Sequence, residues 1–220
     1  MEPDAGELLR RMKAYALPRA TQARGTWIRQ RGLFLMGRRW LPFTAEERFD
    51  AVAPGFEWRA RVRFAPFVWV HVVDAFQRDR GVLRARLLGL TVANESGPDI
   101  TLGECLRLLA ELPWCPFAFD HPAFVWSTTD DGLAVRAPSL VPDASVRFSV
   151  DASGRALRTE ARRPGRMGRR SFVAEWLGEF DDYREFAGMR LPARAQVSWL
   201  LPEGKMTYFR CEIVDAGTLA

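Results

Sequence analysis

The chain has 220 residues, of which 48% are hydrophobic and 12% aromatic, which is enough for one well-buried domain. Its net charge of +5 comes almost entirely from arginine, and acidic residues are interleaved throughout. This even mixing argues against a nucleic-acid partner. No run of about eighteen uncharged apolar residues is present, which excludes a membrane-spanning helix.

The N-terminal segment differs from an export signal because charged residues interrupt its apolar ones. Its spacing predicts an amphipathic helix over Ala5–Ala16. We expect one domain over residues 1–220, with residues 1–22 forming this helix and a linker and residues 23–220 forming the main body. The three cysteines form no C-x-x-C pair and leave one thiol over, which favours a reduced, cytoplasmic protein.

Alternation of apolar and charged residues predicts most of the strands. From Phe56 to Phe64 every even position is apolar and every odd position is charged, as in a strand with one buried and one wet face. The same period, or a continuous apolar run, predicts the other strands, which in chain order are Thr26–Met36, Val68–Phe76, Val82–Leu90, Ala123–Thr129, Leu133–Ala137, Ser145–Val150, Arg155–Arg163, Ser171–Leu177, Ala193–Leu201 and Lys205–Val214.

The remaining segments are predicted as turns, loops and helices. A turn is expected at Arg38–Phe43, a short helix at Ala45–Ala53 and a loop at Asn94–Asp99. The main helix is expected at Thr101–Leu112, since its leucines fall at helical spacing and a proline follows. The chain therefore predicts an α+β fold. We expect a strongly curved antiparallel sheet of about ten strands, a half-barrel or open barrel, with one main helix and a short N-terminal helix.

One helix is too little to fill the concave face of such a sheet, so the interior is either a cavity or a core of large side chains. The aromatic residues expected on this face or near it are Phe56, Trp58, Phe64, Trp69, Phe76, Trp126, Phe148, Trp199 and Tyr208. An aromatic wall favours binding of a bulky hydrophobic small molecule or lipid. Two alternatives stay open: a cofactor-free cyclase or isomerase acting on a polyketide-like or terpenoid-like substrate, and a structural module without ligand.

Four ionisable residues are candidates for an acid or a base in the enzymatic alternative, namely Asp74, Glu57, His71 and Tyr183. His71 and Asp74 have opposite parity in one strand, so we expect them on opposite faces. Burial would raise the pKa of Asp74, and with so many arginines available we expect one to pair with it. We expect Arg107 to form ordinary helix-surface ion pairs with its neighbours Glu104 and Glu111, unless the Glu111 end of the helix faces the cavity.

No common catalytic motif accompanies these residues. Nucleophile elbows, phosphate loops and dinucleotide-binding glycines are missing, and two histidines without a cysteine pair argue against a metal site. We therefore expect no cofactor, no metal and no nucleic acid. The segment Arg155–Arg170 carries seven arginines. It is interpreted as a solvated hairpin tip or, alternatively, as a docking patch for an anionic membrane surface.

Five motifs in a fixed order resemble an uncharacterised bacterial family of unknown function. The resemblance covers residues 25–215 and implies no activity. The motifs are Arg31-Gly32-x-Phe34, Trp40-x-Pro42-Phe43-x-Ala45, Pro54-Gly55-Phe56-x-Trp58, Val73-Asp74-Ala75-Phe76 and Gly103-Glu104-x-Leu106-Arg107-x-Leu109-x-Glu111-x-x-Trp114-x-Pro116.

A weaker resemblance links the C-terminal half to bacterial lipoprotein-carrier half-barrels. It is carried by Phe148, Gly154, Tyr183, Gly188 and the pair Leu191-Pro192 ahead of a strand. In those carriers a curved antiparallel sheet wraps helices around an apolar groove that holds acyl chains. The resemblance implies a half-barrel fold for this chain and an apolar groove on its concave side.

Overall fold

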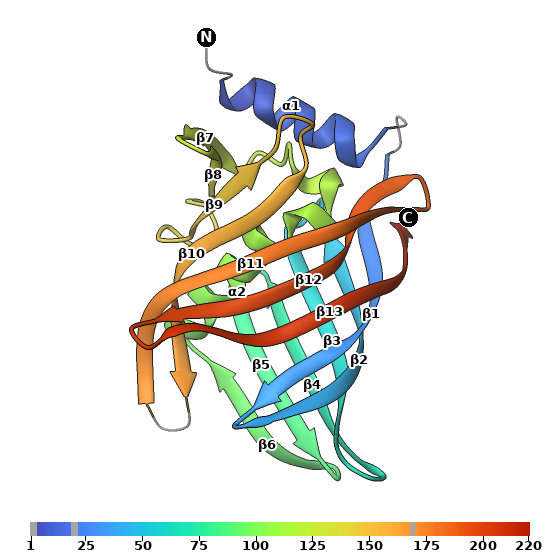
Figure 1. Ribbon diagram of the computed structural model, residues 1–220, viewed down its shortest axis with the longest axis vertical. Helices are drawn as coiled ribbons and strands as arrows, with labels where there is room; N and C mark the ends of the chain where they lie inside the picture. The colour runs from blue at the N-terminus through green and yellow to red at the C-terminus, as the bar shows by residue number, and fades with distance from the viewer. Residues whose placement is uncertain (1–3, 19–21, 168–169) are drawn as a thin grey trace.

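The computed structural model describes residues 4–18, 22–167 and 170–220. In this part of the chain thirteen strands form one antiparallel sheet, in the order β6-β5-β4-β3-β2-β1-β13-β12-β11-β10-β9-β8-β7. The sheet therefore has two arms, β1–β6 and β7–β13, which join where β1 pairs with β13. It is strongly curved and its two edges, β6 and β7, do not pair (Figure 1). The expected α+β half-barrel is confirmed, although its strands number thirteen rather than about ten.

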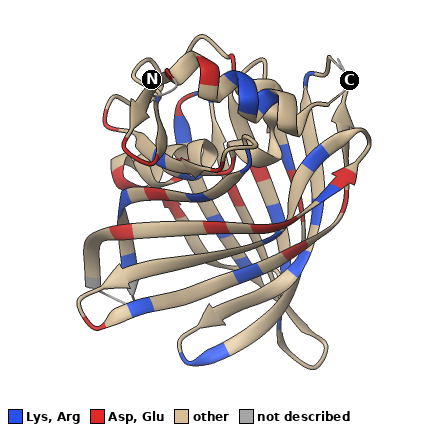
Figure 2. Ribbon diagram, turned by 45° about the horizontal axis from the view of Figure 1, so that its top comes forward, with Lys and Arg blue, Asp and Glu red and all other residues tan. Residues whose placement is uncertain are grey.

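The strands are β1 (Gly25–Met36), β2 (Arg39–Asp50), β3 (Gly55–Ala65), β4 (Val68–Gln77), β5 (Arg80–Leu87), β6 (Leu90–Ser96), β7 (Val125–Thr129), β8 (Gly132–Arg136), β9 (Ser145–Val150), β10 (Ala156–Met167), β11 (Arg170–Phe186), β12 (Met189–Leu201) and β13 (Gly204–Leu219). The helices are α1 (Ala5–Ala16) and α2 (Pro98–Ala110), followed by single 3-10 turns at Leu112–Trp114 and Pro116–Ala118. Acidic and basic residues are interleaved over most strands (Figure 2).

Three of the predicted segments differ from the structure. Most of the turn expected at Arg38–Phe43 and of the helix expected at Ala45–Ala53 is one continuous strand, β2, which spans Arg39–Asp50. Alternate residues of β2 face the concave side, and Phe43, Ala45 and Phe49 are buried there as expected for a half-buried strand. Glu47 is buried at the alternate position between Ala45 and Phe49, so a charged residue interrupts the apolar pattern in the sequence. The loop expected from Asn94 is also wrong at its start, because β6 continues to Ser96.

Both helices lie close to where they are expected. Helix α1 spans Ala5–Ala16, and the Asp4 carboxylate caps it by accepting from the backbone N–H of Glu7 at 2.7 Å. Helix α2 begins at Pro98 rather than at Thr101, whose hydroxyl instead accepts from the backbone N–H of Gly81 at 3.1 Å. Neither helix of the described residues is long and apolar enough to cross a membrane.

Helix α2 crosses the concave face of the sheet and touches strands of both arms, β4 and β5 on one side and β9 and β10 on the other. Every residue from Gly103 to Ala110 is buried. Together with the 3-10 turns, the helix occupies the upper part of the half-barrel, and its buried leucines belong to the hydrophobic core (Figure 1). The lower part of the concave face is not covered by any helix of the described residues (Figure 1).

Candidate functional site

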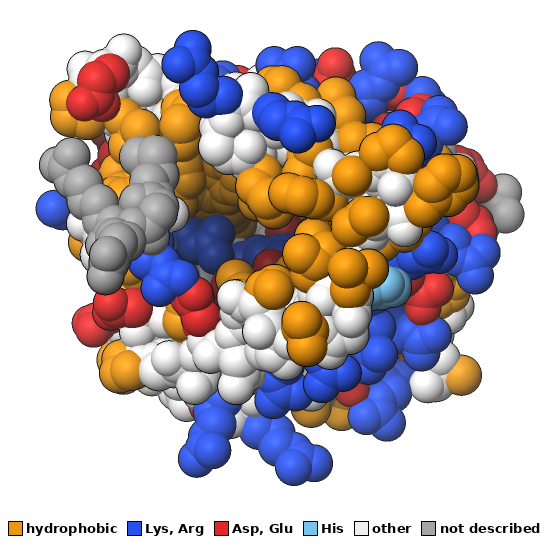
Figure 3. Space-filling view, turned by 90° about the horizontal axis from the view of Figure 1, so that it is seen from below, with side chains coloured by type: hydrophobic (Ala, Val, Ile, Leu, Met, Phe, Trp, Pro, Cys, Tyr) orange, Lys and Arg blue, Asp and Glu red, His pale blue; other side chains and the backbone are white. Residues whose placement is uncertain are grey.

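The lower part of the concave face surrounds a hollow that opens at the lower end of the molecule (Figure 3). Its wall is made of apolar side chains from both arms that stay partly exposed and pack against the buried core. These are Phe34 of β1, Val72 of β4, Ala85 and Leu87 of β5, Phe172 and Ala174 of β11, Val197 of β12, and Met206, Tyr208 and Phe209 of β13. Figure 3 shows hydrophobic side chains along part of the opening, beside charged ones, and further charged side chains deeper inside.

At the inner end, Arg107 of α2 is the centre of a buried ionic cluster. Its guanidinium donates to Glu47 Oε1 at 2.8 Å, to Asp74 Oδ2 at 3.0 Å and to Glu111 Oε1 at 2.9 Å. The side chain of Arg107 is 11% exposed and that of Glu47 is fully buried. The expectation that an arginine pairs with Asp74 is therefore confirmed. The expectation that Arg107 and Glu111 form a surface pair is wrong, because α2 is covered by the sheet.

Aromatic rings support the same guanidinium from the other side. Arg107 lies 4.8 Å from the centroid of Phe56 and 5.1 Å from that of Trp58. The Trp58 indole N–H donates to Gln30 at 3.3 Å, and Gln30 donates to the second oxygen of Glu47 at 2.6 Å. Every strand from β1 to β4 thus contributes a residue to the position of Arg107.

A second buried pair ties α2 to the opposite arm. Arg163 of β10 donates to Glu104 at 3.3 Å, and its guanidinium lies 4.7 Å from the ring of Trp176. The Trp176 N–H donates to the Tyr208 hydroxyl at 2.8 Å. Glu104, expected on the helix surface, is buried as well, so that prediction is wrong. Because Arg107 reaches β2 and β4 while Glu104 reaches β10, the helix is held to both arms by hydrogen bonds from buried guanidinium groups.

The cluster contains more carboxylates than arginines, and this excess determines its protonation. Burial, and then repulsion from Asp74, raises the pKa of Glu104 to about 8, so this side chain is protonated at neutral pH. Burial also raises the pKa of Glu47 and of Asp74. Asp74, Glu104 and Glu111 each keep one buried oxygen without a hydrogen-bond partner in the described part of the chain. The described residues contain no group of histidine, cysteine or acidic side chains arranged to hold a metal ion.

The structure does not bring the four predicted acid or base residues together. Asp74 lies at the inner end of the hollow. Glu57 and His71 lie on the convex face, where Glu57 accepts a hydrogen bond from Arg59 at 2.6 Å. His71 and Asp74 are on opposite faces of β4, as predicted from their odd and even positions in the strand. Tyr183 lies at the upper end, where its hydroxyl donates to the Ala156 carbonyl at 2.7 Å and burial raises its pKa.

The predicted aromatic residues divide into three groups. Trp58, Trp199 and Tyr208 lie on the concave face beside the hollow or the ionic cluster, and Phe64 is partly exposed near the lower end of β3. Four others belong to the packed core or its edge, namely Phe56, Phe76, Phe148 and Trp126. Trp69 lies on the convex face beneath Arg61, 4.9 Å from its guanidinium, and takes no part in the wall.

Sequence reasoning missed several residues of the site. Phe34, Phe172 and Phe209 line the hollow, and all three lie in segments that are predicted as strands. Alternation of Phe172 with Ala174 and Trp176 was the signal that could have found one of them. The ionic cluster gave no local signal, since Glu47 and Arg107 are sixty residues apart in the chain.

Four arginines of the segment Arg155–Arg170 contact carboxyl groups of the protein. Arg163 pairs with Glu104 as described, and Arg155 pairs with Asp151 at 3.0 Å. Arg158 pairs with Asp131 in the turn between β7 and β8 and with Glu160 of its own strand, and Arg166 pairs with Glu95 of β6. Arg169 and the side chain of Arg170 lie outside the described residues. Much of the positive charge of this segment is therefore balanced within the protein.

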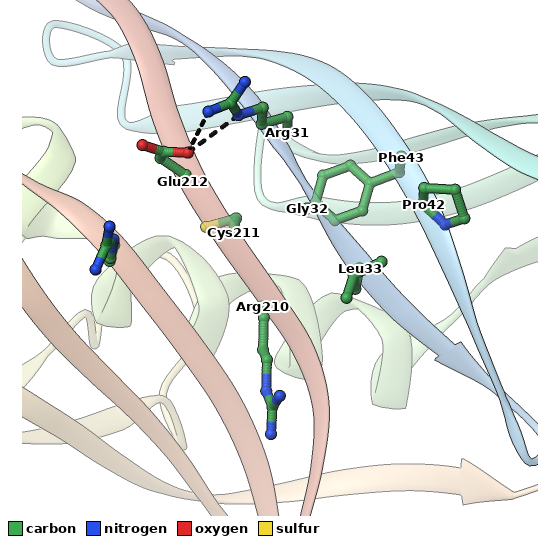
Figure 4. Close-up of a pocket in the computed structure, with 9 residues that line it drawn as sticks. Arg31, Gly32, Leu33, Pro42, Phe43, Arg210, Cys211 and Glu212 are labelled. Atoms are coloured by element: carbon green, nitrogen blue, oxygen red, sulfur yellow. Dashed lines mark hydrogen bonds and ion pairs between the residues drawn. The ribbon is translucent and has the colours of Figure 1, made fainter.

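Two shallow depressions lie outside the hollow. One, of about 430 Å³, lies over the junction of β1 and β13 beside the ion pair of Arg31 with Glu212 (Figure 4). At its base β1 passes so close to β13 that a Cβ on Gly32 would lie 2.0 Å from the carbonyl oxygen of Arg210. This contact explains why glycine follows Arg31 in the first motif. The other, of about 780 Å³, lies beside the start of α2.

A curved sheet that wraps a helix and leaves an apolar hollow defines the half-barrel class, and comparisons with known proteins agree. The chain belongs to the family of unknown function DUF6544, whose model matches residues 9–211. This confirms the resemblance that the five motifs carry. No curated protein matches the sequence.

Several solved structures share the fold. A LolA superfamily protein from Nitrosomonas europaea is 9% identical, with 100% of this chain and 94% of that chain covered and a TM-score of 0.55. A putative outer membrane lipoprotein-sorting protein domain from Vibrio parahaemolyticus is 11% identical, with 96% and 91% covered and a TM-score of 0.54. A DUF1329 family protein from Desulfovibrio piger is 8% identical, with 96% and 90% covered and a TM-score of 0.51. The similarity to lipoprotein-carrier half-barrels is therefore confirmed at the level of the fold.

Proposed function

We propose that the protein binds a hydrophobic small molecule or lipid in the hollow of its half-barrel. The observation that carries this proposal is that apolar side chains of both arms stay partly exposed on the concave face, around a space that opens to solvent (Figure 3). A soluble domain gains stability by burying such a surface, at about 25 cal/mol per Å². A guest molecule would provide that burial here.

The aromatic part of the wall suits an apolar guest. Phe34 packs edge-on against Tyr208 at 6.1 Å, Tyr208 stacks on Trp199 at 6.1 Å, and Trp199 packs edge-on against Phe172 at 5.0 Å. This row of rings crosses from β1 to β11 and presents a rigid surface with few rotatable bonds, so contact with it costs little conformational entropy. The similarity of fold to a structure described as a lipoprotein-sorting domain also supports a lipid as the guest.

A matched pair of variants tests the proposal. Ala174 lies on the concave face of β11 beside Arg163 of the neighbouring strand, and its neighbour Val173 lies exposed on the convex face. Ala174→Trp fills part of the hollow, whereas Val173→Trp adds the same side chain outside it. We expect the dye 1-anilinonaphthalene-8-sulfonate to bind the unaltered protein and Val173→Trp equally, and Ala174→Trp about tenfold more weakly. Equal binding by all three proteins would contradict the proposal.

A cofactor-free cyclase or isomerase that uses the same hollow is the second proposal. The observation that favours it is that two carboxyl groups with raised pKa values, Glu104 at about 8 and Asp74, are buried beside Arg163 and Arg107, where a protonated carboxyl group can serve as a general acid. Incubation of the protein with its bound molecule, followed by extraction and chemical identification of that molecule, separates the two proposals. A guest that is recovered chemically unchanged after prolonged incubation with the protein argues for binding alone, and conversion that Asp74→Asn abolishes argues for the enzyme.

A further inference from the structure

Three hairpin turns at the mouth of the hollow hold bulky apolar side chains in solvent. They join β1 to β2, β3 to β4 and β5 to β6, and all three lie at the lower end of the molecule (Figure 1). Phe67 is 97% exposed, and Leu88 and Leu90 are each 74% exposed. Met36 and Phe64 at the same turns are also exposed. These five residues are called the hairpin tips below.

The backbone at the hairpin tips indicates that these apolar side chains do not serve the fold. Phe67 has a φ of 61° and Leu88 a φ of 50°, in the left-handed region that glycine and asparagine adopt readily and other residues avoid. A large apolar side chain there is strained and contributes almost no burial. Since a glycine or asparagine would suit both positions better, the side chains themselves need another explanation.

Within the three hairpins, the charged residues nearest the turns are all basic. The stretches 30–45, 58–73 and 80–94, which contain the three turns, have no aspartate or glutamate. Arg38, Arg39, Arg63 and Arg86 are exposed close to the turns, and none of them forms an ion pair with a described residue. Basic residues are visible at the turn of β1 and β2 in Figure 2.

Two tryptophans lie behind the hairpin tips, next to arginines. Trp40 follows the first turn and Trp69 follows the second, and both are half-buried on the outer face. Arg210 lies 5.1 Å from the ring of Trp40, and Arg61 lies 4.9 Å from that of Trp69. Tryptophan beside arginine, just behind protruding apolar residues, is the composition found where proteins meet the headgroup layer of a membrane.

We propose that the hairpin tips dock on a bilayer that contains anionic lipid. Phe67, Leu88 and Leu90 enter the headgroup region, and the arginines behind them contact lipid phosphates. A bilayer suits this surface better than a protein partner does, because the apolar residues stand on three separate protrusions around an opening rather than on one flat patch. Docking in this way turns the mouth of the hollow toward the membrane. The proposal goes beyond ligand binding and does not depend on it.

Vesicle co-sedimentation of the full chain tests the docking. We expect the protein to sediment with vesicles of phosphatidylcholine and phosphatidylglycerol, to be released by high salt and to bind phosphatidylcholine alone much more weakly. The double variant Phe67→Asn, Leu88→Asn should bind anionic vesicles about tenfold or more weakly, because two inserting side chains are lost. Its thermal stability should be unchanged or higher, since asparagine accepts the left-handed backbone.

The control is Val52→Asn, which removes an apolar side chain that is 66% exposed from the turn between β2 and β3, at the opposite end of the strands. It should bind vesicles like the unaltered protein. Three results would overturn the proposal: no binding of the unaltered protein to anionic vesicles, equal binding to neutral vesicles, or equal binding by the tip variant and the control. Dye binding in the hollow should be the same for all of these variants, so failure of docking and failure of ligand binding are distinguishable.

Discussion

Replacing Arg107 by methionine tests whether the buried cluster holds α2 against the sheet. Arg107→Met keeps a long side chain but removes three ion pairs of 2.8 to 3.0 Å, in a place where Arg107 is 11% exposed and Glu47 is fully buried. Removing one partner of a buried pair leaves charge without compensation and costs about 3–5 kcal/mol. We therefore expect the free energy of unfolding to fall by about that amount at neutral pH.

The cost should depend on pH in a definite direction. Burial already raises the pKa of Glu47 and Asp74, and loss of the guanidinium raises both further. Both carboxyl groups can then take up protons in the folded variant, which removes their charge. The destabilisation caused by Arg107→Met should therefore shrink as the pH falls from 8 toward 5.

Urea denaturation followed by tryptophan fluorescence measures both effects. The matched control is Arg59→Met, which breaks the exposed pair with Glu57 at 2.6 Å and should cost less than about 1 kcal/mol. If Arg107→Met lowers the free energy of unfolding no more than Arg59→Met does, the cluster does not stabilise the fold and the argument from burial fails.

Two further predictions concern the cluster and the junction of the arms. Glu104 has a raised pKa in the folded state, so the stability that its protonated form contributes is complete below the unfolded pKa and is lost as the pH rises through about 8. Glu104→Gln should flatten the fall of stability between pH 5 and 8, and an unchanged pH profile measured by urea denaturation would contradict this. Gly32→Ala should lower the free energy of unfolding by about 1–3 kcal/mol, because its Cβ would lie 2.0 Å from a β13 carbonyl oxygen. A melting temperature equal to that of the unaltered protein would contradict this, since it would show that β1 and β13 can move apart without cost.

The fold could be predicted from sequence where one physical period dominates a segment. Alternation over Phe56–Phe64 predicts β3, and the leucine spacing after Thr101 predicts α2. Prediction failed at β2 because Glu47 occupies the buried phase, and no rule based on hydrophobicity places a charged residue there. Its burial depends on Arg107, which only the folded chain brings to it.

The site was predictable in kind but not in detail. Aromatic residues in the apolar phase of strands correctly indicate the concave face for Trp58 and Trp199. The depth of each ring cannot be inferred from its strand, because α2 covers one end of that face and not the other. Phe148 of β9, a strand that α2 contacts, is therefore fully buried, while Phe34 and Phe172 stay partly exposed in the hollow.

Native mass spectrometry of the full-length protein isolated from its own cells tests ligand binding in the hollow most directly. The unaltered protein and Val173→Trp should both carry the added mass of a hydrophobic molecule, and Ala174→Trp should carry much less of it. The bare mass of the chain in all three proteins, under conditions that preserve the bound lipid of a known carrier, would contradict a role in binding hydrophobic molecules.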